Sequence, residues 1–264
     1  MKTKSFAKWV SAIGVALLMA GSACAADVRV MISAGYYRVY AELGPAFEKA
    51  TGNHLITVRG PSMGDSPEAI PTRLARGEVT DVVIMDGEAA SELGAKGLVR
   101  PESKTELALS QIGLVVRAGA PKPKIDTVDA LRNTLLAAKS IAYSDSGSGT
   151  YLSTKMFAKL GVADQIMGKS RKVRGPPSGE PVAAVIARGE AEIGFQQLSE
   201  LMHVPGVDLV GAIPAELQPG FSFAGVIAKS SQQPEAAAAL IRFLASPEAA
   251  SVVTKAGLTP IAKR

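Results

Sequence analysis

Residues 73–87, RLARGEVTDVVIMDG, decide the fold, and residues 187–201, ARGEAEIGFQQLSEL, repeat their pattern. In both stretches a helical segment ends at the glycine of A-R-G-E and leads into an apolar strand. The matching letters lie 112 residues apart, and each copy follows a loop rich in Gly, Pro and Ser, at residues 59–68 and 174–180. Chance similarity of two helix ends is one interpretation. Two lobes of like α/β construction is the other, and we favour it.

The rest of the chain alternates strand, loop and helix in the same way. Residues 28–33, 54–58 and 81–85 form β-rich runs separated by helical spacing, and the order restarts with a strand at residues 140–144. This order is typical of an α/β protein with mainly parallel sheets and covering helices. Strand-like runs at residues 108–117 and 221–228 predict that the chain crosses twice between the lobes. We therefore expect lobe 1 at residues 26–107 and 222–264, and lobe 2 at residues 108–221.

The N-terminus predicts an exported protein. Three lysines precede an apolar run at residues 9–20, and Ala23 and Ala25 form an A-x-A site, which together indicate a cleavable signal peptide at residues 1–25. The run is too short for a membrane span, and no later stretch qualifies. Acylation of Cys24 is an alternative, but Gly21 stands where lipoprotein signals usually have Leu. We expect cleavage after Ala25 and a periplasmic mature chain.

Charge and composition exclude several function classes. The leader holds three lysines and no acidic residue, so its removal lowers the formal charge from +5 to +2. With 5% aromatic residues and no basic run, nucleic-acid binding has no support. The only Cys leaves with the leader, and His54 and His203 are far apart, so neither a thiol nucleophile nor a Ser-His-Asp site is indicated. We find no metal-ligand spacing and no nucleotide motif, and we expect no cofactor.

The quoted stretches, with residues 30–37 (VMISAGYY), 149–162 (GTYLSTKMFAKLGV) and 243–260 (FLASPEAASVVTKAGLTP), resemble the ModA-like branch of type II periplasmic binding proteins. The resemblance covers nearly all of the mature chain. It implies a two-lobed fold with a cleft between the lobes for a small anion. It also implies a monomer that serves a permease of the ABC class, a partner we leave open.

The molybdate binders of this family surround their oxyanion with hydroxyls and a tyrosine, and this chain departs from that set. Gly35 stands in place of the first-loop serine, Ser62 is kept, and the tyrosine position falls at Gln197. These losses argue against molybdate, because a desolvated dianion needs every donor. The chain is more similar to the organic-anion branch that includes aconitate isomerases, so we expect a small polycarboxylate as ligand.

The candidate ligand-binding residues lie in loops that follow predicted strands, where α/β sheets bind ligands. Arginine suits a carboxylate because its fork binds both oxygens, and hydroxyls at helix starts serve capping and anion binding alike. Ordinary surface, capping or packing roles are the alternatives for all of them. The candidates are Tyr37, Arg38, Arg59, Ser62, Ser148, Thr150, Tyr151, Arg174 and Gln197.

An isomerase also needs a base, because moving the double bond of aconitate requires removal of a methylene proton. Glu180, in the second Gly/Pro/Ser loop, is our candidate, and a plain acidic residue at a helix start is the alternative. Three hypotheses follow in order: an exported cis/trans-aconitate isomerase, a transport receptor for a carboxylate, and a molybdate or tungstate receptor.

Overall fold

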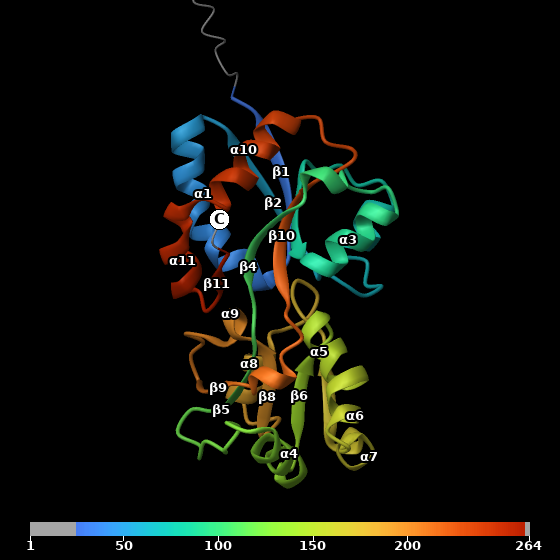
Figure 1. Ribbon diagram of the computed structural model, residues 1–264, viewed down its shortest axis with the longest axis vertical. Helices are drawn as coiled ribbons and strands as arrows, with labels where there is room; N and C mark the ends of the chain where they lie inside the picture. Colours follow the sequence, from blue (N-terminus) through green and yellow to red (C-terminus); the bar gives the residue numbers. More distant parts are fainter. Residues whose placement is uncertain (1–24, 262–264) are drawn as a thin grey trace, which may run out of the picture.

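The computed structural model describes residues 25–261, which form two lobes, each built around one β-sheet (Figure 1). Of the predicted signal peptide, only Ala25 lies within the described residues; Cys24 lies outside them. The chain passes from the first sheet to the second at Ser110 and Gln111 and returns just before Ser222. Both crossing segments run side by side between the lobes in Figure 1.

The first sheet has six strands with helices on both faces. Successive side chains of a strand point to opposite faces of the sheet, so Val30 and Ile32 pack on one layer of helices and Met31 packs on the other. In spatial order the strands are β11 (Thr259–Pro260), β4 (Thr105–Leu109), β10 (Ser222–Ile227), β3 (Val82–Asp86), β1 (Asp27–Ile32) and β2 (His54–Arg59). The first face packs on α1 (Ala34–Thr51), α10 (Pro234–Leu244) and α11 (Ala250–Lys255), and the second on α2 (Ile70–Ala75) and α3 (Gly87–Ala95).

The second sheet has five strands and is also covered on both faces. Its strand order is β7 (Ser170–Val173), β6 (Ile141–Ser144), β8 (Ile193–Gln197), β5 (Ile112–Arg117) and β9 (Val207–Ala212). One face packs on α4 (Val128–Ala137), α5 (Gly147–Tyr151), α6 (Phe157–Lys159) and α7 (Ala163–Ile166), and the other on α8 (Val182–Ala187) and α9 (Leu198–Leu201). A π-helical turn, Leu152–Met156, joins α5 to α6. Short 3-10 turns occur at Pro101–Ser103, Met167–Lys169, Ala215–Leu217 and Pro247–Ala249.

The two-lobed α/β class expected from the sequence is confirmed, with one refinement: both sheets are mixed. In the first, β1 runs parallel to β2 and β3, while β10 runs antiparallel to β3 and β4. In the second, β6 runs parallel to β7 and β8, while β5 runs antiparallel to β8 and β9. The crossing strands β5 and β10 run against their neighbours because each enters its sheet from the junction between the lobes, and the short strand β11 also runs antiparallel to β4.

The repeated A-R-G-E motif occupies equivalent places in the two lobes. It closes α2 in the first lobe and α8 in the second, and both helices have six residues. Gly77 (φ 83°) and Gly189 (φ 74°) follow them in the left-handed conformation that glycine adopts without strain. Each glycine leads into an inner strand, β3 or β8.

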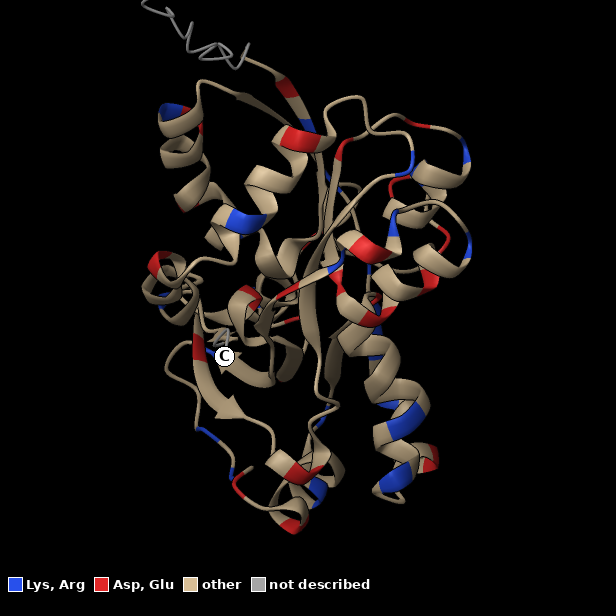
Figure 2. Ribbon diagram, turned by 45° about the horizontal axis from the view of Figure 1, so that its top comes forward, with Lys and Arg blue, Asp and Glu red and all other residues tan. Residues whose placement is uncertain are grey.

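Within residues 25–261 no single helix is long and apolar enough to cross a membrane. Helices α10 and α11 together pass that test of length and composition, but the pair is bent by 52°. Leu240, Ile241 and Val253 of this pair are buried in the core of the first lobe. Acidic and basic residues both occur on both lobes (Figure 2).

Candidate functional site

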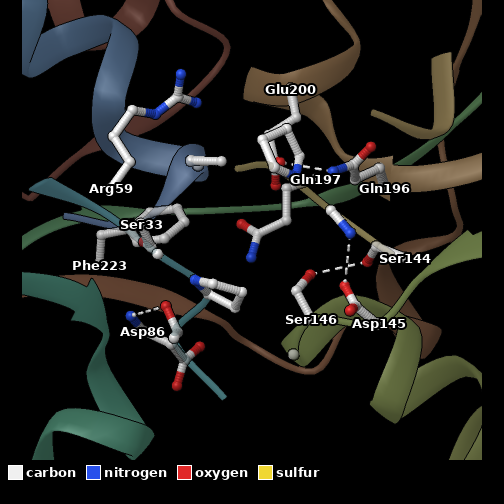
Figure 3. A pocket seen from close by; sticks show the side chains of 18 residues that line it. Ser33, Arg59, Asp86, Ser144, Asp145, Ser146, Gln196, Gln197, Glu200 and Phe223 are labelled. Carbon is white, nitrogen blue, oxygen red and sulfur yellow. Dashed lines mark hydrogen bonds between the residues drawn. The ribbon is translucent and has the colours of Figure 1, made fainter. Parts of the chain in front are cut away.

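A cleft between the lobes collects the carboxyl ends of five strands. Residues that end or directly follow β1, β2, β3, β6 and β8 line it, as the crevice rule for α/β sheets predicts. Its volume is about 570 Å3, counting the part open to solvent. Polar side chains of the two lobes face one another across it (Figure 3). They are Ser33, Arg59, Ser62 and Asp86 from the first lobe, and Ser144, Asp145, Ser146, Gln196, Gln197 and Glu200 from the second.

Four helices begin at this cleft, α1, α3, α5 and α9, and two of the residues that precede them are serines whose hydroxyls do not cap the helix; the hydroxyl of one, Ser146, lies 2.8 Å from that of Ser144 instead. Asp86 caps α3 by accepting hydrogen bonds from the backbone N–H groups of Glu88 and Ala89, both at 3.0 Å. Ser33 and Ser146, at the starts of α1 and α5, make no such bond. The Ser33 hydroxyl is buried, with 4% of the residue exposed, and finds no partner among the described residues. A buried hydroxyl without a partner is costly unless a ligand supplies one.

Arg59 is the one basic side chain among the residues that line the cleft. Its guanidinium lies over the ring of Tyr37, 4.1 Å from the ring centroid. The buried Nε has no hydrogen-bond partner within residues 25–261. This cation is therefore held by stacking while its donors stay available for a carboxylate.

Glu200, on α9, supplies the cleft with a titratable group near neutrality. Burial raises the pKa of its carboxyl to about 7. A hydrogen bond from Gln196 and the charge of Arg59 lower the pKa, and the charge of Asp145 raises it, but burial outweighs them. A carboxyl group with such a pKa can accept and return a proton at physiological pH.

The two aspartates in the cleft are occupied with backbone donors. Asp86 caps α3, and burial raises the pKa of its carboxyl above the usual value. Asp145 accepts a hydrogen bond from the backbone N–H of Gly175 at 3.1 Å. Over the part of the chain that the structure describes, no cluster of three His, Cys, Asp or Glu is placed to hold a metal ion.

Phe223 explains the glycine at position 35. A Cβ at Gly35 would lie 2.2 Å from Cζ of Phe223, and both residues line the cleft. The ring therefore leaves no room for a serine side chain at position 35, and the hydroxyl that lines the cleft here belongs to Ser33, two residues earlier. The aromatic ring makes this side of the cleft apolar, which suits the carbon skeleton of an organic ligand.

Of the predicted ligand-binding residues, the structure brings Arg59, Ser62 and Gln197 into the cleft. The Ser62 hydroxyl accepts the backbone N–H of Asp86 at 3.1 Å. Two more touch residues that line it: Tyr37 lies beneath Arg59, and the Ser148 hydroxyl lies 3.1 Å from that of Ser144. Thr150 and Tyr151 line an adjoining groove that shares Asp86 and Gly147 with the cleft.

The remaining predicted residues lie outside the cleft lining. Arg38 donates to the Met202 carbonyl at 3.1 Å, and Arg174 pairs with Glu68 at 3.2 Å, so both link the two lobes. Glu180 makes two hydrogen bonds of 2.7 Å with Arg188. These bonds hold the pKa of Glu180 below its usual value, and such a group is a weak base.

Residues 28–259 match the family model of the bacterial extracellular solute-binding proteins. The chain belongs to this family. This solute-binding protein is 46% identical over 254 residues to an aconitate isomerase of Pseudomonas sp., and the match covers 95% of each chain. It is 27% identical over 257 residues to the molybdate-binding protein ModA of Azotobacter vinelandii, covering 96% of this chain and 97% of that one. The predicted resemblance is thereby confirmed, with the organic-anion branch as the nearer of the two.

Solved structures show the same fold. The periplasmic molybdate-binding protein of Azotobacter vinelandii superposes with a TM-score of 0.70 at 20% identity, covering 90% of this chain and 100% of that one. The sulfate-binding protein SubI from Mycobacterium tuberculosis superposes with a TM-score of 0.69 at 19% identity, covering 89% and 87%. At these sequence identities the similarity establishes only the fold.

Sequence reasoning missed Glu200, although a signal was present. The rule that ligands bind beyond strand ends applies to the run QQLSE at residues 196–200 of this solute-binding protein. That run contains a carboxyl group three residues past the end of β8. Ser33, at the end of β1, satisfies the same rule.

The raised pKa of Glu200 predicts a pH-dependent stability. Its carboxyl titrates at about 7 in the folded chain and near 4.5 when unfolded, so the folded state carries the cost of a buried charge only as pH rises through this range. We expect Glu200→Gln to raise the free energy of unfolding by about 2–3 kcal/mol at pH 8.5 and by almost nothing at pH 4.5. Urea unfolding of the ligand-free protein at the two pH values measures this. An equal change at both would contradict it.

Proposed function

We propose that this solute-binding protein is a periplasmic isomerase that interconverts cis- and trans-aconitate without a cofactor. The observation that carries the proposal is Glu200, a carboxyl group with a pKa of about 7, placed in a cleft that also holds Arg59. The 46% identity to an aconitate isomerase supports the same activity. A receptor needs donors for its ligand, but it has no need of a group that exchanges protons at neutral pH.

The chemistry is an allylic proton shift. Ionised Glu200 removes a proton from the methylene carbon, and the electron pair spreads over the three-carbon system onto the far vinylic carbon and its carboxylate. Return of a proton to that vinylic carbon makes it the new methylene and forms the double bond on the other side. No hydrogen is gained or lost overall. The new double bond takes either geometry without rotation about the old one.

The lobe opposite Glu200 supplies the positive end of the site. Arg59 and the Ser33 hydroxyl offer donors that are unused within the described residues, and the first-turn N–H groups of α1 begin beside them. These groups bind one carboxylate and stabilise the charge that develops on it. Gln197 and Ser146 reach the ligand from the second lobe. Such donors replace the water that a polycarboxylate loses on entering the cleft.

A transport receptor for a small carboxylate, working as a monomer with an ABC permease, is the second candidate. It rests on membership of the solute-binding family and on the two-lobed fold. A molybdate or tungstate receptor is less well supported, because Gly35 and Gln197 stand where a serine and a tyrosine were expected and because three carboxyl groups, those of Asp86, Asp145 and Glu200, line the cleft.

A proton NMR time course with trans-aconitate in D2O tests the proposal. We expect cis-aconitate to appear, with deuterium in its methylene group, because Glu200 exchanges its proton with solvent between removal and return. Broadened ligand signals without product would contradict the isomerase and favour a carboxylate receptor. An unchanged spectrum would contradict both, and a rise in melting temperature with micromolar molybdate would then favour an oxyanion receptor.

A further inference from the structure

The Glu200 carboxyl accepts a hydrogen bond from Gln196, whose side-chain amide uses both its oxygen and its nitrogen in hydrogen bonds. Gln196 lies at the end of β8 with 3% of its surface exposed. Its Oε1 accepts the backbone N–H of Val182, the first residue of α8, at 3.3 Å. A backbone N–H can only donate, so the amide oxygen must face α8 and the amide nitrogen must face the cleft.

The amide nitrogen of Gln196 then donates to Oε2 of Glu200 at 2.5 Å (Figure 3). One carboxyl oxygen is therefore occupied by a donor that cannot turn round, because reversing the amide would place its oxygen against the carboxylate and its NH2 against a backbone N–H. The second oxygen, Oε1, makes no hydrogen bond to another described residue. A proton added to Glu200 goes preferentially to Oε1, because the hydrogen bond that Oε2 accepts lowers the basicity of that oxygen.

We propose that Gln196 is a positioning residue for the reaction: its fixed N–H orients the Glu200 carboxyl so that Oε1 carries the transferred proton, and its hydrogen bond favours the ionised form of that carboxyl. The proposal rests on the proposed isomerase. It assigns to Gln196 no contact with the reacting atoms.

Three other charged groups face α9 and must be weighed against Gln196. Arg59 of β2 favours ionised Glu200, and Asp145, after β6, opposes it. Arg38 of α1 bonds to the carbonyl of Met202, which directly follows α9. These groups act through space or on the helix end. Within residues 25–261 only Gln196 hydrogen-bonds to the Glu200 carboxyl, so loss of this bond removes a contact that orients the carboxyl and favours its ionised form.

Gln196→Met tests this, because methionine fills the same space without a donor. We expect the pKa of Glu200, followed by 13C NMR of labelled glutamate and assigned by the signal missing in Glu200→Gln, to rise by about one to two units. The acid limb of kcat/KM should move up with it. Activity at pH 7 should fall about tenfold or more and recover substantially near pH 9. Gln196→Glu, which pairs two carboxyl groups, should raise the pKa at least as far.

The control is Gln218→Met, which removes another internal amide. Among the described residues the side-chain amide of Gln218 bonds only to backbone atoms of Ile112 and Ile213, so its loss should lower stability and leave the Glu200 titration unchanged. A folded Gln196 variant with an unshifted Glu200 pKa, or with the same fractional loss of activity at every pH, would overturn the proposal. A wild-type protein without isomerase activity would refute the proposed function. The NMR titration of Glu200 needs no turnover, so it would still decide whether Gln196 sets the protonation of that carboxyl.

Discussion

Replacing Glu200 by glutamine is expected to lower kcat for aconitate isomerisation roughly 10³-fold, the range that a positioned general base contributes. Glutamine keeps the size and polarity of the side chain but cannot accept a proton from carbon. The dissociation constant for trans-aconitate should stay within a few-fold of wild type, because Arg59, Ser33 and Gln197 are untouched. Initial rates followed by the ultraviolet absorbance of the product, with calorimetry for binding, measure the two quantities separately.

Glu180→Gln is the matched control for that experiment. It removes the same charge by the same chemical change, in the second Gly/Pro/Ser loop, from a side chain that pairs with Arg188 and does not line the cleft. We expect its kcat to remain within about twofold of wild type, since surface ion pairs contribute little. A large loss in Glu180→Gln with full activity in Glu200→Gln would contradict our assignment of the base and restore the candidate that the sequence suggested.

Gly149→Ala is expected to lower the free energy of unfolding by about 3–5 kcal/mol, because its added methyl group meets the closest contact of any glycine within residues 25–261. A Cβ at Gly149, in α5, would lie 1.6 Å from the carbonyl oxygen of Ser144 at the end of β6. The atoms that this Cβ would meet are backbone atoms of Ser144, and β6 is held between β7 and β8. The start of α5 must therefore move away from the sheet, taking Ser146 out of the cleft. Ligand affinity should fall together with stability.

Gly168→Ala serves as the control for the glycine substitution. Gly168 is exposed in a 3-10 turn, and a Cβ there meets no atom within 4 Å. Its free energy of unfolding should change by no more than about 0.5 kcal/mol. Guanidinium unfolding of both variants at one pH gives the comparison. A Gly149→Ala protein within 1 kcal/mol of wild type would show that α5 can retreat from β6 without cost.

The fold could be predicted from the sequence because its signals are local. Consecutive apolar residues such as Val30, Met31 and Ile32 define a strand with two buried faces. Gly77 and Gly189 end their helices through a local backbone conformation that does not depend on the rest of the fold. The positions of Arg59, Ser62 and Gln197 in the cleft follow from the same kind of signal, since each lies at or just after the end of a strand. The direction of β5 and β10 did not follow, because it depends on how the chain crosses between the lobes.

The sequence by itself determined two α/β lobes with a polar cleft at their strand ends; only the tertiary structure decided which carboxyl group serves that cleft. Glu180 and Glu200 both lie in segments that follow strands of the second lobe. Glu180 bonds to Arg188 outside the cleft, whereas Glu200 bonds to Gln196 in the cleft. Arg174 likewise turns to Glu68, 106 residues away. The direction of such a side chain depends on the hydrogen-bond and charge partners that lie within its reach, and these partners are brought together only when the chain folds.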